Sequence, residues 1–371
     1  VIGGVGGVIV FLPQICILFF FISLLEDSGY LARAAFVMER VMRVVGLPGK
    51  AFVPMLSAHA CAIPGIMAAR VIDSWRDRLV TILVLPMLTC SARLPVYTMV
   101  AALLFADSPG LAAVMFFAAY LLGIVAALLT AFMLKHTILK GEVSPLVLEL
   151  PPYRRPSLRN ALLNVFDRAT VFVRRAGTVI LLISVGLWAL SNYPKLPEDS
   201  LANEVTSTKL PVEPMADSST DNETPSDQAE RMEAQERLAY SAAGRVGRVL
   251  EPVFAPLGFD WKINVGVVSS FAAREVIVST LSIIYGVGED SETLTETLQH
   301  QQRPDGSPVY SRATCFSLLV FYVLAMQCLP TQVVTSRETG SWRWAILQLV
   351  YMTALAYGAA LVTFQVTTWL G

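Results

Sequence analysis

GLPGKAFVPMLSAHACAIPGIMAARVIDSWRDRLVTILVLPMLTCSARLPVY, residues 46–97, is unusual because four prolines lie inside its apolar runs, at positions 54, 64, 86 and 95. A proline inside a helix removes a hydrogen-bond donor and frees a carbonyl. A membrane segment tolerates such a break only where its backbone faces protein or a water-filled cavity. The stretch therefore predicts interrupted helices around a transport site, with a re-entrant hairpin over residues 51–70.

Candidate metal ligands lie beside these breaks. Cys61 and Cys90 lie three and four residues from a proline, and Cys328 lies two residues before another. His59, between two alanines, needs a partner for both ring nitrogens. Thiolate and imidazole suit Fe²⁺, Zn²⁺ and copper better than Mg²⁺ or Ca²⁺. We predict that the three thiols and His59 converge near the bilayer midplane, although a single free cysteine fits equally well as a small buried hydrophobe.

The composition is that of an integral membrane protein. Hydrophobic residues make up 54% of the 371 residues and charged residues 15%, against about 25% charged in a soluble domain. The net charge of −1 argues against a nucleic-acid partner. The five cysteines show no paired spacing, so we expect reduced thiols. Motifs typical of hydrolases, P-loops and dinucleotide-binding folds are absent from the sequence, and nothing in it supports catalysis.

Charge distribution orients the chain in the membrane. Residues 26–50 have the pattern of an amphipathic helix in the interface. Residues 135–175 carry eight Lys or Arg against three acids, which places this loop in the cytoplasm. Residues 195–237 carry eleven acids and four basic residues, which predicts a disordered loop on the outer face. The spans that we expect are 1–25, 79–106, 110–135, 176–193, 313–333 and 342–370.

The chain repeats itself. A shift of 212 residues places Arg33 on Arg245, Glu39 on Glu251, Gly46 on Gly258, Lys50 on Lys262 and Ser57 on Ser269. Interrupted segments at matching positions are typical of transporters built from inverted repeats, with the site at the repeat interface. We therefore predict an all-α polytopic bundle with two inverted repeats. Its parts are a first repeat with a following transmembrane hairpin (1–135), a basic cytoplasmic loop (136–165), a transmembrane helix (166–193), an acidic disordered loop (194–240), a second repeat (241–290), a polar loop (291–312) and two C-terminal transmembrane helices (313–371).

Polar residues within the apolar segments mark a candidate transport path, because ionisable groups at membrane depth are costly and usually functional. Glu275 should face the interior and pair with Arg274 or with an arginine of the first repeat. The alternative is that Arg274 and Glu275 are paired with other residues in a purely structural role. The full set of path residues is Ser57, Met67, Met87, Ser91, Arg93, Ser269, Ser270, Glu275 and Gln327.

Four runs, residues 46–70, 76–97, 256–281 and 337–345, resemble the membrane domain of the FeoB family of ferrous iron transporters. The resemblance implies two Gate-type repeats, Fe²⁺ as the transported substrate, and a GTPase domain before this region, so that GTP acts only through that domain. The start at Val1 without a Met is what we expect of a longer protein that was cut. One departure is AHACAIP at 58–64, where the family more often has Gly-Phe-Gly-Cys-Asn-Val-Pro, so the ligand set can differ.

The resemblance also implies a multi-pass protein of the cell inner (cytoplasmic) membrane. Its partners would be the lipid bilayer and small cytosolic accessory proteins, with a homo-oligomer left open. Two other functions fit the same residues: a gate-fold transporter of an organic solute such as a nucleoside, and a membrane thiol redox protein using Cys61 and Cys90.

Overall fold

The computed structural model describes residues 19–106, 108–139, 155–172, 241–271, 274–285, 291–303, 306–326 and 328–370, with positions 13, 16, 17, 153, 182, 185, 186 and 287. In these residues the chain is helical apart from its connections and one isolated bridge, Gln302 to Pro308. Four described stretches are long and apolar enough to cross a membrane: Trp75–Phe105, Pro109–Thr137, Arg312–Thr339 and Trp342–Trp369. The predicted all-α polytopic membrane fold is confirmed.

The helices of the two halves follow the same order. Each half has one amphipathic helix, a pair of short helices, a broken long helix and an unbroken helix of 29 residues. In the first half these are α2 (Tyr30–Val44), α3 (Phe52–Ala58), α4 (Ala62–Ala68), α5 (Trp75–Val84), α6 (Leu94–Phe105) and α7 (Pro109–Thr137). In the second they are α12 (Ala242–Phe254), α13 (Trp261–Ser269), α14 (Val276–Tyr285), α16 (Arg312–Leu324), α17 (Leu329–Thr339) and α18 (Trp342–Leu370).

The prolines that follow the helix breaks lie in the first turn of the next helix. Pro95 and Pro330 are the second residues of α6 and α17, and Pro64 is the third residue of α4. In the first turn of a helix the backbone N–H has no partner inside the helix, so a proline there costs little. The breaks therefore lie just before these prolines, and α16–α17 continues to Thr339 instead of ending at 333 as predicted.

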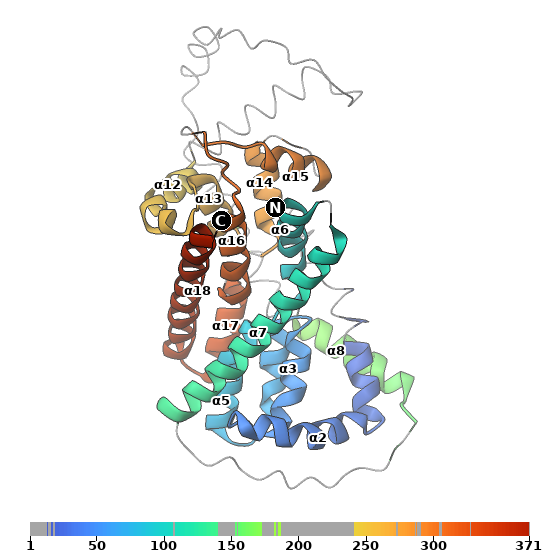
Figure 1. Ribbon diagram of the computed structural model, residues 1–371. Helices are drawn as coiled ribbons and strands as arrows, with labels where there is room; N and C mark the ends of the chain where they lie inside the picture. Colours follow the sequence, from blue (N-terminus) through green and yellow to red (C-terminus); the bar gives the residue numbers. More distant parts are fainter. Residues whose placement is uncertain are drawn as a thin grey trace.

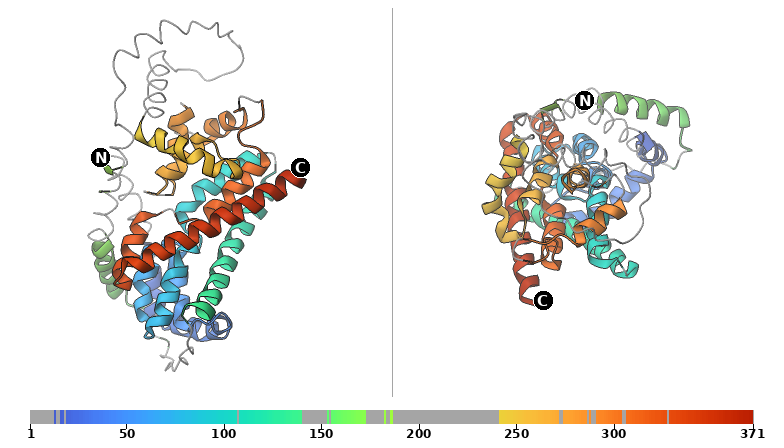
Figure 2. Two further views of the ribbon diagram at one scale, coloured as in Figure 1. Left: turned by 90° about the vertical axis from the view of Figure 1, so that its left-hand side faces the viewer. Right: turned by 90° about the horizontal axis from the view of Figure 1, so that it is seen from above.

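The amphipathic helices lie at opposite ends of the bundle. Figure 1 shows α2 across the lower end and α12 near the upper end, with α7 and α18 running between them. The left view in Figure 2 shows α7 and α18 as long helices at the outside of the bundle. This placement agrees with an inverted repeat, which remains a prediction. The exposed face of α2 is apolar at Phe36, Val37, Val41 and Val44, as expected of an interfacial helix.

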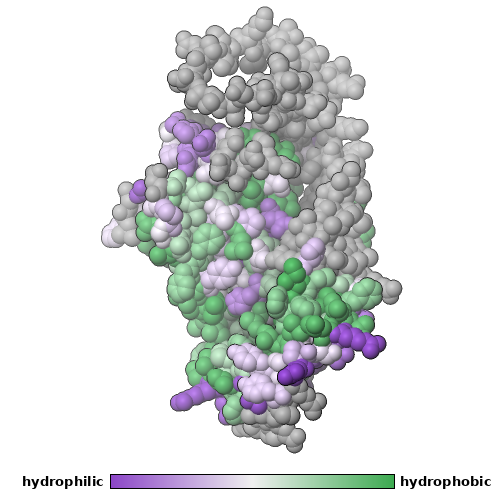
Figure 3. Space-filling model, turned by 90° about the vertical axis from the view of Figure 1, so that its right-hand side faces the viewer, coloured by the Kyte–Doolittle hydropathy of each residue, from purple (hydrophilic) through white to green (hydrophobic). Residues whose placement is uncertain are grey.

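The outer faces of the two long helices are apolar. Hydrophobic side chains cover much of the face in Figure 3, and the most hydrophilic atoms lie near its lower end. Such a surface suits the hydrocarbon of a bilayer. The exposed apolar residues of α7 and α18 are Leu111, Val114, Phe117, Leu121, Leu122, Val125, Leu129, Phe132, Met133, Ile346, Val350, Leu355, Val362, Val366 and Trp369.

Two short helices occupy segments predicted as loops. α15 (Ser291–Gln299) lies within the polar loop at 291–312, because Leu294 and Leu298, one turn apart, are both buried. α8 (Leu158–Phe172) begins inside the loop at 136–165 and is tied to the first segment by Asn164, which donates to the Ser23 hydroxyl at 3.1 Å. Most of the span at 1–25, and the whole of 176–181, 187–193 and the acidic loop at 194–240, lie outside the described residues.

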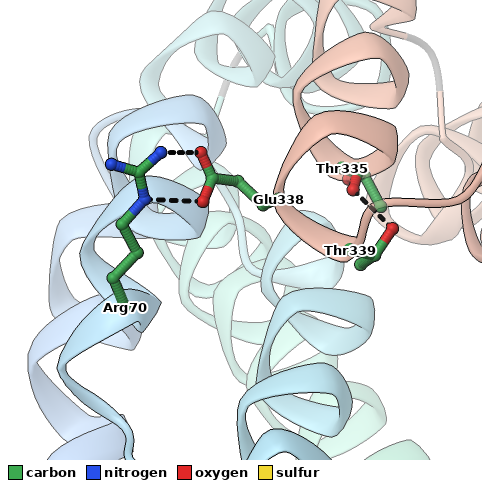
Figure 4. Close-up of polar contacts among 4 residues, drawn as sticks. All are labelled: Arg70, Thr335, Glu338 and Thr339. Atoms are coloured by element: carbon green, nitrogen blue, oxygen red, sulfur yellow. Dashed lines mark hydrogen bonds and ion pairs between the residues drawn. The ribbon is translucent and has the colours of Figure 1, made fainter.

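Four ion pairs between described residues gather around the end where α2 lies. Arg43 pairs with Glu39 within α2, and Lys50 pairs with Asp73 at the open end of the α3–α4 pair. Lys135 at the end of α7 forms a buried pair with Asp77 in the first turn of α5. Arg70, in the short helix η2 (Ala69–Val71) after α4, pairs with Glu338 of α17 and so joins the two halves (Figure 4).

Candidate metal site at four helix breaks

Four helix interruptions adjoin one another inside the bundle. Two belong to the first half, at residues 59–61 and 88–90. Two belong to the second half, where α13 ends at Ser269 and α14 begins at Val276, and where α16 ends at Leu324 and α17 begins at Leu329. The Ser91 hydroxyl donates to the Ala60 carbonyl at 3.0 Å, which joins the first two breaks. The Leu329 N–H donates to the Phe271 carbonyl at 3.0 Å, which joins the other two. Packing of α4 on α17 and of α6 on α14 brings both pairs together.

At each break, a residue whose side chain can bind a metal ion lies directly before the second helix. Cys61 directly precedes α4, Cys328 precedes α17, and Glu275 precedes α14. Cys90 precedes the short helix η4 (Ser91–Arg93), which leads into α6. The N-terminal end of a helix carries partial positive charge and favours a thiolate or carboxylate beside it. Three thiols and one carboxyl group therefore lie directly before the second helix of a break.

The thiols are neighbours but do not form a finished metal centre. Cys90 and Cys328 lie close enough to Cys61 to interact with it electrostatically across the break. Among the described residues, no group of three or more His, Cys, Asp or Glu side chains is arranged to hold a metal ion. All five cysteines are free thiols. Because Zn–S and similar bonds are about 2.3 Å long, binding one ion between these thiols requires the helix ends to come closer together.

Arg93 binds the carbonyls that the break near Pro86 exposes. Its side chain is fully buried, and its two terminal nitrogens donate to the carbonyl oxygens of Met87 and Pro86, both at 3.0 Å. These carbonyls belong to the short helix η3 (Leu85–Met87), after which the backbone becomes extended. Arg93, predicted as a path residue, thus stabilises the interrupted backbone in this conformation.

Gln348 and Tyr351 of α18 donate hydrogen bonds to carbonyls near the end of α5. Gln348 donates to the carbonyls of Ile82 at 3.0 Å and Leu83 at 2.8 Å, and the Tyr351 hydroxyl donates to Leu83 at 2.6 Å. The sequence interpretation missed both residues. The available signal was a glutamine inside a 29-residue apolar helix, because polar residues at membrane depth usually have a specific partner.

His59 has one ring nitrogen available as a ligand. Its Nδ1 lies 3.2 Å from the carbonyl oxygen of Thr89. Because a carbonyl only accepts hydrogen bonds, Nδ1 carries the hydrogen in this contact and Nε2 keeps its lone pair. The ring stacks on Tyr120, with centroids 6.4 Å apart. His59 therefore presents the tautomer that binds a metal through Nε2.

Several predicted path residues use their polar groups locally. Ser57 is buried and donates to the Val53 carbonyl within α3. Ser270, the residue directly after α13, is buried and donates to the Val267 carbonyl of that helix. Ser269 bonds to Thr280 at 2.8 Å, across the α13–α14 pair. Met87 is buried and Met67 is half-buried in the core.

Glu275 is half-buried, and no ion pair joins it to another described residue, so its predicted pairing with an arginine is not seen there. Gln327 lies outside the described residues.

Two family models match most of the chain. One, named Gate and described as nucleoside recognition, matches residues 8–104 and 173–342, and one for the C terminus of ferrous iron transport protein B matches 116–168. A protein of Leptospira interrogans named Fe(2+) transporter FeoB is 43% identical over 99% of this chain. The chain belongs to the FeoB family. The resemblance read from the sequence is thereby confirmed.

Other FeoB relatives are similar over the same length. An Fe(2+) transporter FeoB of Methanocaldococcus jannaschii is 37% identical over 98% of this chain. A fusion protein of Porphyromonas gingivalis, named for Fe(2+) transport protein A and FeoB, is 40% identical over 99%. The chain spans about half the length of the relatives it matches, with 50%, 48% and 43% of these three covered. No solved structure matches the chain.

Proposed function

We propose that this chain moves ferrous iron across the membrane through the centre formed by the four helix breaks. The observation that carries the proposal is the placement of Cys61, Cys90 and Cys328 as the last residues of adjoining breaks, directly before the next helix. Thiolates and imidazoles suit Fe²⁺, and three of them at one depth offer a replacement for its hydration shell. The FeoB relatives are named as Fe(2+) transporters, which supports this choice of ion.

The ion site would form by movement of the half-helices. The thiols are neighbours without being arranged as a metal centre, so an ion that binds several of them stabilises a closer approach of α4, α6 and α17. A ligand shifts a conformational equilibrium by its differential affinity for the two states. His59 adds a fourth ligand through Nε2, and Glu275 a hard oxygen ligand at the remaining break.

Fe²⁺ uptake into liposomes that contain the purified protein tests the proposal. Replacement of Cys61, Cys90 or Cys328 by Ala should each lower the initial uptake rate by about tenfold or more, equivalent to a loss of about 1.4 kcal/mol or more. Cys315→Ala is the matched control, because Cys315 is a buried thiol of α16 away from the breaks. Uptake that survives all three centre substitutions, or that Cys315→Ala reduces equally, would overturn the proposal.

A nucleoside-type solute is the second candidate, because the family model that matches most of the chain is described as nucleoside recognition. The same liposomes distinguish it. Uptake of a radiolabelled nucleoside that needs no metal and is unchanged in Cys61→Ala would favour an organic substrate. Fe²⁺ uptake that excess nucleoside leaves unchanged would exclude it, and competition by Zn²⁺ and Mn²⁺ would report metal selectivity.

We also propose the wider setting that the resemblance implies. A GTPase domain elsewhere in the full-length protein would control the permease, which is placed in the cytoplasmic membrane. The P. gingivalis relative is fused to Fe(2+) transport protein A, which supports a small accessory protein as a partner. Fe²⁺ uptake by the full-length protein with GTP and with a non-hydrolysable analogue inside the liposomes tests this control. Equal uptake with and without nucleotide would contradict it.

A further inference from the structure

Arg274 is a buried cation without a matching anion in the described part of the protein. It lies in the break between α13 and α14, two residues before Val276, and is 4% exposed. Its Nη1 is buried and has no hydrogen-bond partner. None of the ion pairs between described residues includes it, and the neighbouring Glu275 is not paired with it. A buried guanidinium without a partner is unfavourable, so such an arrangement calls for a function.

The other arginine buried at the breaks has a structural role. Arg93 uses both terminal nitrogens on the carbonyls of Met87 and Pro86. Arg274 has no such contact at Nη1, and its guanidinium lies close enough to Cys61 and Cys328 to interact electrostatically with both thiols. These two thiols come from different halves of the chain, at the start of α4 and of α17. The guanidinium therefore acts on two of the sulfur atoms assigned to the transported ion.

We propose that Arg274 is a fixed cation that competes with the transported ion for the thiols of Cys61 and Cys328, and so keeps the site weak enough to release the ion. This inference rests on the proposed iron transport. Two cations that act on the same sulfur atoms repel each other, and the repulsion is stronger in a buried site than in water. Conduction requires binding that is favourable enough for entry yet weak enough for exit.

A site made of thiols alone would lack this property. Several soft ligands around one ion bind it tightly and release it slowly. Arg274 lowers the affinity without occupying a ligand position, and its charge remains in place while the ion comes and goes. Loss of the charge should therefore tighten binding and slow turnover together, whereas loss of a ligand should weaken both.

Co²⁺ binding to the detergent-solubilised full-length protein tests the affinity, because thiolate–Co²⁺ absorption reports sulfur ligation directly. Arg274→Gln should lower the Co²⁺ dissociation constant by about tenfold. In liposomes the same variant should lower both the maximal Fe²⁺ uptake rate and the Fe²⁺ concentration for half-maximal uptake. Arg274→Lys keeps the charge and should stay close to the parent protein. Arg274→Met, unbranched and apolar, replaces the Gln variant if that variant does not fold.

The outcomes separate this inference from the proposed function. Folded Arg274→Gln or Arg274→Met protein that binds Co²⁺ no more tightly than the parent overturns the role of Arg274. An equal change in Arg274→Lys shows that charge is not the cause. If the double variant with Cys61→Ala still shows tighter binding, the effect does not pass through Cys61, and the inference is wrong. A parent protein without a thiolate–Co²⁺ band and without Cys61-dependent Fe²⁺ uptake contradicts the proposed function itself.

Discussion

The ion pair between Arg70 and Glu338 should hold the two halves together at the end of the bundle where α2 lies. Arg70 Nε and Nη2 donate to the two carboxylate oxygens of Glu338 at 2.7 and 2.6 Å (Figure 4). The nearby Thr339 hydroxyl already donates to the carbonyls of Thr335 and Ser341. No other ion pair of Glu338 is formed within the described residues, so removal of Arg70 leaves its carboxylate with nothing equivalent.

The two members of the pair differ in exposure, and the effects of their loss should differ with it. The Glu338 side chain is 8% exposed and that of Arg70 is 54% exposed. Breaking a buried pair costs about 3–5 kcal/mol, whereas an exposed pair contributes about 1 kcal/mol or less. Arg70→Gln leaves a nearly buried carboxylate without its partner, so it should reduce the free energy that holds the two halves together by about 1–3 kcal/mol, a value between that of an exposed and that of a buried pair. Glu338→Gln leaves a half-exposed guanidinium that water can solvate, and should cost about 1 kcal/mol or less.

Hydrogen–deuterium exchange of α4 and α17 in the reconstituted protein measures the opening of this contact. Each 1.4 kcal/mol should raise the open population about tenfold, and exchange of amides that open locally follows that population. Lys50→Gln is the control, because its partner Asp73 is 87% exposed and the change should be small. Equal effects of Arg70→Gln and Lys50→Gln, or a larger effect of Glu338→Gln than of Arg70→Gln, would refute the reasoning. So would a double variant at Arg70 and Glu338 whose effect equals the sum of the single effects.

Two further predictions concern contacts of the first half. Gly46→Ala should lower the melting temperature in detergent, because Gly46 has φ +79° and an added Cβ would lie 2.8 Å from Cγ of Lys135. Gly110→Ala is the control, because an added Cβ there meets open space. Equal melting temperatures of the two variants would count against the strain argument. Gln348→Leu should lower the free energy of unfolding by about 1–3 kcal/mol, because it removes the donor to the buried carbonyls of Ile82 and Leu83. Denaturant unfolding measures this loss. A smaller loss than that of Tyr351→Phe would contradict the role given to Gln348.

The positions of the breaks could be predicted from the sequence, because proline has the same local effect wherever the chain leads. Pro95 and Pro330 mark the two long helices that break, and Cys90 and Cys328 lie just before them. The sequence could not show whether each break precedes or follows its proline. That depends on whether the proline's missing N–H falls in a first turn, where it needs no partner.

The partners of the freed carbonyls could not be predicted, because they come from distant parts of the chain. Gln348 reaches a carbonyl 265 residues earlier, and only packing of α18 beside the end of α5 brings the two together. Arg93 is close in sequence to Pro86 and Met87, whose carbonyls accept its hydrogen bonds. The side chain points back to them only because the backbone is extended at Leu88 and Cys90. Motif reasoning assigned Arg93 to the path because a buried charge in an apolar run usually marks one.

Two lysines that correspond under the predicted 212-residue repeat make different contacts in the two halves. Lys50 and Asp73 form an ion pair, with Nζ 2.6 Å from the carboxylate. The same shift leads to Lys262 and Tyr285, and Nζ of Lys262 lies 4.3 Å from the centroid of the Tyr285 ring. The corresponding lysines thus contact corresponding positions in both halves, which supports the predicted repeat, but the contact is ionic in one half and cation–π in the other.

Salt screens an exposed ion pair strongly and a packed cation–π contact less. Rising ionic strength should therefore loosen the α3–α4 pair before the α13–α14 pair, and faster exchange in α13–α14 first would show that the lysine contacts do not set this order.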